Sequence, residues 1–254
     1  MKSRRKPGQV SLERALSKLG IASRTEARAW IESGRVRCNG MVIRDPVRWV
    51  VPEKLKIELD GVELNRPVPI VLMLHKSRGT ITTRSDERGR PTVFDGLPAE
   101  FQGFGNLHAV GRLDAATTGL LLLTNDTKLS SWLTDPVQAI PRLYRVTVRG
   151  EVTSPKIKTL LQGVPSEVGE LHPTAIELLK ASQRESHLLV TLQEGKNREV
   201  RRLFESVGHE VTDLKRLAFG GLRLGDLPVG TVRKVSDGEL ALAFPGLLLP
   251  SVHE

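Results

Sequence analysis

The sequence has too few cysteines and too few grouped histidines to build a fold on disulfides or bound metal. Cys38 is the only cysteine, so no disulfide can form within the chain. The six histidines are scattered, and no short-spaced group of Cys and His predicts a tetrahedral metal site. We therefore expect neither a structural zinc nor another bound metal.

Long apolar runs are also missing. No stretch approaches the roughly 20 apolar residues of a membrane helix. The basic start MKSRRKPGQVSLERALSKLG has no apolar segment of the kind found in secretory signals, and no apolar heptad indicates association between chains. With 254 residues, 39% of them hydrophobic and 26% charged, the chain can bury a core. We expect a globular, cytoplasmic and monomeric protein.

What the sequence does have is an excess of positive charge, concentrated near the N-terminus. Residues 1–60 hold 14 Lys and Arg against 7 Asp and Glu, a net charge of +7 out of +9 for the whole chain. Residues 61–254 hold 24 against 22. This asymmetry favours a polyanionic partner, either nucleic acid or an acidic membrane surface, although a basic tail that keeps the protein soluble would look the same.

The N-terminal segment is typical of a small module with two helices. Leucines at helical spacing predict a helix over residues 12–19, and the capping box Ser23–Glu26 starts a second helix that ends near Gly34. The dipeptide Asn39-Gly40 predicts a hairpin turn between short strands.

Basic residues recur four apart along both predicted helices. Arg14 with Lys18, and Arg24 with Arg28, each project from one helical face, where they can contact successive phosphates. A solvated charged face is the alternative interpretation.

The stretch SLERALSKLGIASRTEARAWIESGRVRCNGMVI resembles the α-L RNA-binding domain, first seen in a small-subunit ribosomal protein. In that family the second helix and the following hairpin face structured RNA. The resemblance implies that Arg24, Arg28, Arg35 and Asn39 lie on the RNA side of a domain over residues 9–62.

A change of pattern near residues 61–69, in GVELNRPVPI, marks a domain boundary. It is followed by an apolar strand, IVLMLHK, and a polar loop, SRGTITTRSDERGRPTVFDGLP, whose composition suits either a phosphate backbone or an ordinary surface loop. We predict a second domain over residues 68–245.

The stretch HAVGRLDAATTGLLLLTNDTKLSSWLTD places Asp114 in a turn between two strands. A carboxylate there can act as a nucleophile or general base if a nearby cation, such as Arg112, keeps it ionised. From these residues alone, Asp114 can equally be a turn residue that bonds its own backbone.

The run VGRLDAATTGLLLLTND is similar to the signature of the RsuA/RluB-type ribosomal RNA pseudouridine synthases, in which the Asp of Gly-Arg-Leu-Asp is catalytic. The same family has a strand tyrosine about thirty residues later, and PRLYRVTVRG supplies Tyr144, the only tyrosine here. In EGKNREVRRLFESVG, Arg201 stands at the position of the basic residue that pairs with the catalytic Asp. The resemblance covers residues 11 to about 240.

The resemblance implies an α+β fold, with the small RNA-binding domain followed by a mixed, mainly antiparallel sheet with helices. It implies an enzyme that needs no cofactor and converts uridine to pseudouridine in ribosomal RNA after flipping the base onto Tyr144. Asp114 acts on either the ribose or the uracil ring. The RNA contacts expected in total are Arg14, Lys18, Arg24, Arg28, Arg35, Asn39, Lys76, Arg84, Arg112, Lys196, Arg198 and Arg202.

Three positions depart from the family pattern. Ser77 replaces a usual proline, His75 an asparagine, and Glu199 a common glutamine. None is a catalytic group, but Glu199 adds a negative charge beside arginines that are expected to contact phosphates.

Two other functions remain open from the sequence. One is a ribosome-assembly factor that binds RNA without catalysis. The other is a glycoside or nucleoside hydrolase that pairs Asp114 with Asp126 or Glu194, since such enzymes need two carboxylates at a defined separation. Within the family, loop similarity favours large-subunit RNA as substrate over small-subunit RNA.

Overall fold

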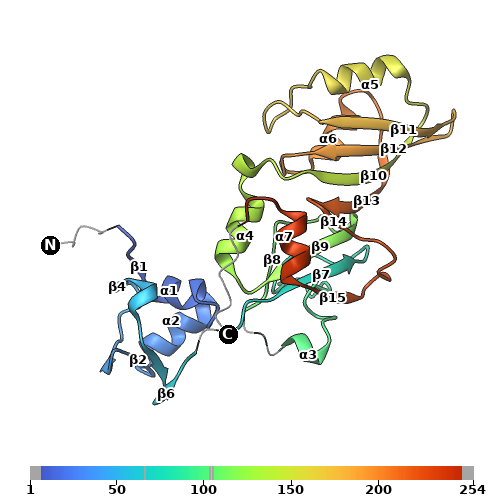
Figure 1. Cartoon of the computed structure of the whole chain (residues 1–254). Coiled ribbons are helices and arrows are strands. Elements are labelled where there is room, and N and C mark those ends of the chain that lie inside the picture. Colours follow the sequence, from blue (N-terminus) through green and yellow to red (C-terminus); the bar gives the residue numbers. More distant parts are fainter. Residues whose placement is uncertain (1–6, 66, 103, 105, 248–254) are drawn as a thin grey trace. The chain divides into compact units, whose positions relative to one another are not determined.

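The computed structural model describes residues 7–65, 67–102, 104 and 106–247 (Figure 1). The chain divides into two compact units. The first comprises Met1–Ile70, Ala99–His108 and Thr124–Ser130, and the second comprises Val71–Pro98, Ala109–Leu123 and Ser131–Glu254. The predicted domain limits of 9–62 and 68–245 remain a prediction.

The first part of the chain contains two helices and several short strands. In chain order these are β1 (Val10–Ser11), α1 (Leu12–Lys18), α2 (Arg24–Glu32), β2 (Val36–Cys38), β3 (Met41–Val42), β4 (Trp49–Val50), the 3-10 helix η1 (Pro52–Lys54), β5 (Ile57–Leu59) and β6 (Val62–Glu63). One sheet has the order β3-β2-β5-β6, and β1 pairs with β4.

Local sequence explains most of this unit. Ser23 and Glu26 form the predicted capping box at the start of α2, with both reciprocal hydrogen bonds present. Asn39 and Gly40 both have positive φ, 49° and 82°, as a two-residue hairpin between β2 and β3 requires. The apolar faces of α1 and α2 meet in a common core of buried residues, with Leu12, Leu16, Ala27, Ile31 and Val36 fully shielded.

The remaining elements follow from Val71 onward. They are β7 (Val71–Lys76), α3 (Ala99–Gln102), β8 (His108–Ala109), β9 (Thr118–Thr124), α4 (Thr127–Thr134), η2 (Pro136–Gln138), β10 (Arg142–Arg149), α5 (Ser154–Leu161), β11 (Ala175–Ala181), β12 (Glu185–Leu192), α6 (Glu199–Glu205), β13 (Val211–Phe219), β14 (Leu222–Arg223), β15 (Val232–Val235) and α7 (Asp237–Ala243).

Nine of the described strands form one sheet. Its main path is β11-β12-β10-β13-β9-β7-β15, with β14 beside β13 and β8 beside β9. β10 is antiparallel to both β12 and β13, whereas β13 and β9 run parallel. The sheet is therefore mixed and mainly antiparallel, which confirms the predicted α+β class.

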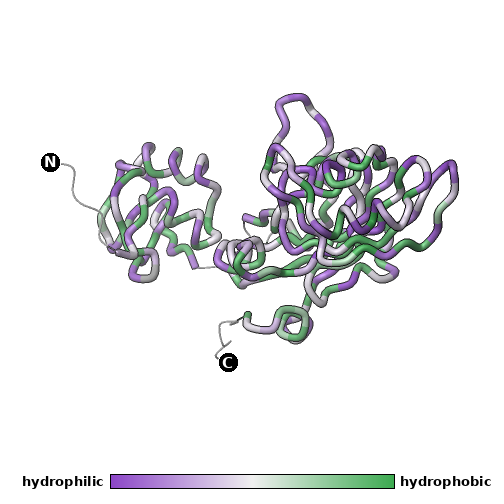
Figure 2. The backbone as a smooth tube through the Cα atoms, turned by 90° about the horizontal axis from the view of Figure 1, so that it is seen from above, coloured by the Kyte–Doolittle hydropathy of each residue, from purple (hydrophilic) through white to green (hydrophobic). Residues whose placement is uncertain are grey.

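The core of this unit lies along the sheet. All four leucines of β9 are fully buried, as is Phe204 of α6. Trp132 of α4 is only half-buried and meets Phe244 edge to face, with ring centroids 6.4 Å apart. Figure 2 shows hydrophobic segments along the strands and hydrophilic ones in the protruding loops.

β9 and β13 approach each other unusually closely at Gly119. This glycine has φ +104° and pairs with Arg216, and a Cβ added to it would collide with the backbone of Arg216. Only glycine therefore allows this contact, which brings the start of β9 against the middle of β13.

Candidate active site

Asp114 lies in the turn between β8 and β9, as the sequence predicted. The Thr117 N–H donates to the Asp114 carbonyl at 3.0 Å, which closes the turn, and the carboxylate is half-buried. On the preceding side, the Thr82 hydroxyl donates to the Leu113 carbonyl at 2.8 Å and accepts from the Leu113 N–H at 3.2 Å. Asp114 is thus held in a turn that is tied to a second loop.

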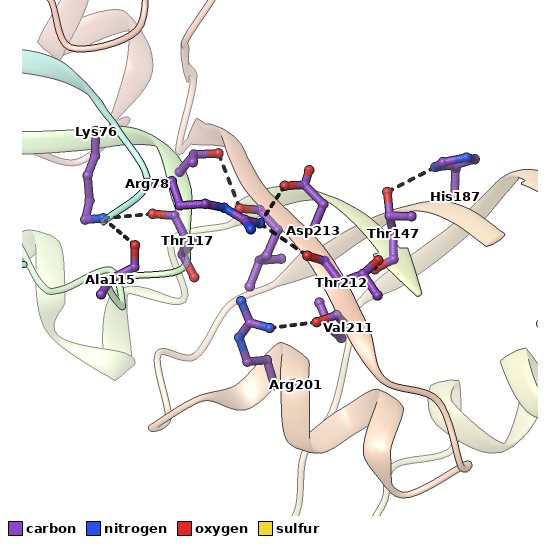
Figure 3. Close-up of polar contacts among 12 residues, drawn as sticks. Lys76, Arg78, Ala115, Thr117, Thr147, His187, Arg201, Val211, Thr212 and Asp213 are labelled. Atoms are coloured by element: carbon purple, nitrogen blue, oxygen red, sulfur yellow. Dashed lines mark hydrogen bonds and ion pairs between the residues drawn. The ribbon is translucent and has the colours of Figure 1, made fainter. Parts of the chain in front are cut away.

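A buried ammonium group supports the same turn. Lys76, at the end of β7, is completely shielded from solvent, and its Nζ donates to the carbonyls of Thr117 at 2.9 Å and Ala115 at 3.5 Å (Figure 3). The same Nζ donates to the carbonyl of Ser77 at 3.0 Å. Burial lowers the pKa of Lys76 to about 8, while the negative charge of Asp114 acts in the opposite direction. The expected RNA contact of Lys76 is wrong for this structure, because the charge points inward to loop carbonyls.

Two arginines hold the start of β13. Arg78 donates from Nη2 to the Thr212 carbonyl at 3.2 Å and to the Asp213 carboxylate at 3.1 Å, and Arg201 of α6 donates from Nη1 to the Val211 carbonyl at 2.8 Å (Figure 3). These bonds fix the distance between α6, the loop after β7 and the sheet.

The second nitrogen of Arg201, Nη2, is buried and has no hydrogen-bond partner in the part of the chain that the structure describes. Burial lowers the pKa of Arg201, and the negative charge of Asp114 opposes that shift. The Arg201 guanidinium and the Asp114 carboxylate therefore attract each other electrostatically. Among the described residues, the two side chains form no ion pair. The predicted pairing of Asp114 with Arg201 stays a prediction.

Asp114, Tyr144 and Arg201 line one cavity of about 160 Å³. Its charged and polar lining consists of Arg112, Asp114, Thr117, Thr134, Arg142, Tyr144, Lys196, Arg198, Glu199, Arg201 and Arg216. A cavity of about 150 Å³ is large enough to hold benzene, so this one can admit a single six-membered ring. The structure thus brings together the three residues that the family resemblance nominated as catalytic.

The inner face of β10 contributes Tyr144, which is 9% exposed. Its neighbour across the sheet is Arg216 of β13, and Arg142 lies two residues earlier on the same face of β10. The guanidinium groups of Arg142 and Arg216 lie over the ring of Phe219, at 5.0 and 5.4 Å from its centroid. One wall of the cavity is therefore cationic and aromatic.

Sequence reasoning missed these two arginines. Alternation along β10 would have identified Arg142, since Arg142, Tyr144, Val146 and Val148 all face inward. The same alternation on β13 places Arg216 beside Leu214 on the inner face.

Glu199, the departure from the family pattern, also lines the cavity. Its side chain is 5% exposed, Oε2 accepts from the Lys196 N–H at 3.2 Å, and Oε1 has no partner among the described residues. Burial raises the pKa of Glu199, which favours the neutral carboxylic acid.

The other residues of this unit that are expected to contact RNA differ in whether their side chains are exposed or already bound to other groups of the protein. Arg112 and Arg198 are exposed and line the cavity. Lys196 forms an ion pair with Glu194 and donates to the Glu170 carbonyl at 2.5 Å, and Arg202 pairs with Glu167 at 2.9 Å. Arg84 is exposed, with its guanidinium 5.4 Å from the ring centroid of Phe94.

In the N-terminal unit, Arg14, Lys18 and Arg24 are exposed. Arg28 pairs with Glu13 at 2.8 Å, and Arg35 pairs with Asp60 at 2.5 Å, which lowers the pKa of that carboxyl. The Asn39 side chain accepts from the Lys56 N–H at 3.0 Å, so it holds the hairpin as well as facing solvent.

A metal site and a membrane-spanning helix are both absent from the part of the chain that the structure describes. Within the described residues, no group of three or more His, Cys, Asp or Glu is arranged to hold a metal ion. None of the helices that the structure describes is long and apolar enough to cross a membrane.

Comparison with known proteins identifies the family of this chain. The family model for RNA pseudouridylate synthase matches residues 70–206, and the model for the S4 domain matches residues 11–47. The chain belongs to the RNA pseudouridylate synthase family, and it is an RNA pseudouridine synthase with an N-terminal S4 domain, which confirms the resemblance.

Several curated relatives cover most of the chain. The chain is 34% identical over 234 residues to the ribosomal large subunit pseudouridine synthase B of Bacillus subtilis (strain 168), covering 90% of this chain and 93% of that protein. It is 41% identical over 221 residues to the synthase of the same name from Shigella flexneri, covering 84% and 74%. An uncharacterised RNA pseudouridine synthase of Mycobacterium tuberculosis is 37% identical over 241 residues, covering 94% and 95%.

A solved structure shares the fold. The crystal structure of a pseudouridylate synthase superposes with a TM-score of 0.63 at 24% identity, covering 91% of this chain and 98% of that one. The arrangement of sheet and helices described above is therefore the fold of this enzyme class.

Proposed function

We propose that this enzyme isomerises one specific uridine of large-subunit ribosomal RNA, with Asp114 as its nucleophile. The observation that carries the proposal is the convergence of Asp114, Tyr144 and Arg201 on one cavity that can admit a single ring. Relatives named ribosomal large subunit pseudouridine synthase B, at 34% and 41% identity, support the substrate. Small-subunit RNA is the second candidate.

The target base must leave its stack to enter the cavity. Flipping a nucleotide out costs a few kcal/mol, and contacts to the backbone offset that cost. Tyr144 provides an aromatic face inside the cavity on which uracil can stack. The exposed side chains Arg112 and Arg198 at the cavity contact the flanking strand.

Two routes lead from uridine to pseudouridine with Asp114 as nucleophile. In one, the carboxylate attacks C1′ of the ribose, the N1–C1′ bond breaks, and its electron pair stays on the uracil ring. After the ring turns, C5 forms a bond to C1′, the carboxylate leaves, and C5 loses its proton. In the other, Asp114 adds to C6 across the C5–C6 double bond, and C1′ moves from N1 to C5. Elimination of the carboxylate from C6 with loss of the C5 proton then restores the double bond.

Arg201 and Lys76 have separate tasks in this proposal. Arg201 screens and orients the Asp114 carboxylate through its unpartnered Nη2. Lys76 acts as a positioning residue, because its ammonium group donates to the carbonyl of Thr117 in the turn that carries Asp114.

The N-terminal unit supplies RNA affinity. We assign the RNA-binding domain to residues 9–62 and the catalytic domain to residues 68–245. The RNA contacts of the RNA-binding domain come first from the exposed cations Arg14, Lys18 and Arg24. Arg28 and Arg35 are engaged in surface ion pairs, which contribute little and can be exchanged for phosphate contacts.

The geometry disfavours a hydrolase with paired carboxylates. Asp126 accepts from the Lys128 N–H at 2.8 Å and the Leu129 N–H at 3.1 Å, so it caps the start of α4. Glu194 pairs with Lys196, and neither Asp126 nor Glu194 lines the cavity with Asp114.

The test is pseudouridine content of unmodified ribosomal RNA transcripts after incubation with the parent protein and with Asp114→Asn, with the new site mapped by position. We expect pseudouridine at one large-subunit position with the parent only, and equal RNA binding by both proteins. Pseudouridine from Asp114→Asn would refute the nucleophile. Binding without turnover by both would favour the assembly-factor function, and hydrolysis of free uridine would favour the hydrolase.

A further inference from the structure

Arg216 is a buried cation whose hydrogen bonding is incomplete. Its side chain extends from β13 and is 3% exposed. Nε donates to the Leu120 carbonyl at 2.6 Å, while Nη2 is buried and has no acceptor among the residues that the structure describes. Buried polar groups of charged side chains are nearly always paired, so an unpaired guanidinium N–H in a functional cavity indicates a missing acceptor.

The position of Arg216 is fixed by the strands around it. It pairs with Tyr144 across β10 and with Gly119 across β9, and its guanidinium lies over the ring of Phe219. Tyr144 and Arg216 are direct neighbours on one face of the sheet, and both line the cavity. A ring stacked on Tyr144 would therefore have its edge beside Arg216.

The other cation of this wall is already occupied. Arg142 directs Nη1 to the carbonyls of Gln193 at 2.7 Å, Glu194 at 3.0 Å and Ile140 at 3.2 Å. Arg142 thus organises the chain before α6. Of Arg142 and Arg216, Arg216 is the one with a buried nitrogen, Nη2, that has no acceptor among the described residues.

We propose that Nη2 of Arg216 donates a hydrogen bond to a carbonyl oxygen of the flipped uracil. This inference rests on the proposed function. A phosphate oxygen is a poorer match, because a cavity of about 160 Å³ is filled by the base while the phosphates stay on the strand outside. A water molecule in place of the carbonyl is an outcome that the test distinguishes.

The contact matters most during the reaction. When the N1–C1′ bond breaks, its electron pair stays on the ring, and the negative charge spreads onto the ring nitrogen and the two carbonyl oxygens. A guanidinium already in place stabilises that charge more than the neutral base, so it lowers the barrier as well as positioning the ring. If the acceptor is O4, Arg216 also discriminates against cytosine, which carries a donor amine there.

The experiment measures single-turnover rates on the RNA segment that contains the site mapped for the parent enzyme. The target position carries uridine, 2-thiouridine or 4-thiouridine, because sulfur is a weaker hydrogen-bond acceptor than oxygen. The proteins are the parent, Arg216→Gln and Arg145→Gln. Arg145 is the matched control, since it lies next to Tyr144 on β10 but is exposed on the opposite side of the strand.

We expect the parent to be slowed roughly 10-fold or more by one of the two sulfur substitutions, which identifies the oxygen that Arg216 contacts. Arg216→Gln should be slowed about 10- to 100-fold on uridine and should lose its sensitivity to that same substitution. Arg145→Gln should behave like the parent on all three substrates. RNA affinity should be unchanged throughout.

Three results would overturn the inference. The first is an Arg216→Gln protein that keeps the parent's full difference between uridine and thiouridine, as expected if a water fills the site. The second is a parent that processes all three substrates at the same rate, a result that holds even if Arg216→Gln fails to fold. The third is a folded Arg216→Met, which has no hydrogen-bond donor in its side chain, that matches the parent in both rate and thiouridine sensitivity. A parent that makes no pseudouridine refutes the proposed function instead.

Discussion

The ammonium group of Lys76 donates a hydrogen bond of 2.9 Å to the carbonyl of Thr117, three residues after Asp114. A completely buried cation therefore lies beside the turn that carries Asp114. The backbone carbonyls replace its hydration, and Asp114 supplies the opposite charge. This arrangement makes the active-site turn depend on a group whose charge changes within an accessible pH range.

Replacing Lys76 by methionine should change how the free energy of unfolding depends on pH, because the variant has no ammonium group at this position. The pKa of Lys76 is lowered from 10.5 to about 8 in the folded protein. Below pH 8 both states carry the proton, but between pH 8 and pH 10.5 the unfolded state binds more protons than the folded state. The free energy of unfolding of the parent should therefore rise with pH relative to Lys76→Met, by roughly 1–3 kcal/mol.

Urea unfolding of the two proteins at pH 7.5, 9 and 10 would measure their difference in free energy of unfolding. Titration of all other groups contributes equally to both proteins and cancels in that difference. A difference that stays constant or falls with increasing pH would show that Lys76 is not a buried, partly desolvated ammonium.

Glu199→Gln should stabilise the enzyme at neutral pH. Burial raises the pKa of Glu199 above 4.5, so ionisation of this carboxyl disfavours the folded state as pH rises. A neutral amide of the same shape avoids that penalty. We expect a gain of about 1–3 kcal/mol at pH 8, which fades as the pH falls through 4.5 and Glu199 becomes protonated in the unfolded state as well.

Thermal or urea unfolding across this pH range measures the gain. Glu205→Gln on the exposed side of α6 is the control for removing one negative charge from the helix. Equal pH dependence in the two variants would mean that burial of Glu199 has no energetic effect.

Gly119→Ala should disrupt the contact between β9 and β13. The added Cβ would meet the backbone of Arg216, which cannot move without breaking strand pairing. We expect a loss of roughly 3 kcal/mol or more, the sum of overpacking and strain at positive φ. Gly169→Ala is the control, since Gly169 has φ +94° but open space around its Cβ position, and should lose about 1–2 kcal/mol. Equal losses in urea unfolding would contradict the close approach.

Arg201→Met should reduce single-turnover pseudouridine formation by roughly 100-fold, because its buried guanidinium no longer screens the Asp114 carboxylate. Arg149→Met removes one charge from an exposed surface pair with Glu210 and should keep the parent rate. RNA affinity, measured by filter binding, should fall slightly and equally in both variants. Loss of activity in proportion to RNA affinity would show that Arg201 acts on the RNA strand alone.

Several local features could be predicted because they depend on residues close together in the sequence. The capping box at Ser23 and Glu26, the hairpin at Asn39 and Gly40, and the turn at Asp114 all form hydrogen bonds between neighbours. The family motifs also identified Tyr144 and Arg201, and both line the cavity with Asp114.

Lys76 was assigned wrongly for a physical reason. A lysine at the end of a strand usually reaches solvent, but Val71–Lys76 is buried along its whole length. The continuous apolar run before Lys76 is typical of a strand covered on both faces, and that signal would have indicated a buried ammonium.

The sequence by itself determined the helices and turns, the family, and the turn that contains Asp114, because short-range hydrogen bonds and apolar spacing require no distant partner. Only the tertiary structure decided that Arg216 lies beside Tyr144 and that Glu199 is buried in the same cavity. Those contacts depend on β10 pairing with β13, two strands separated by more than sixty residues, and on the close approach that Gly119 permits. Pairing over that distance is set by the free energy of the whole sheet, which no local pattern contains.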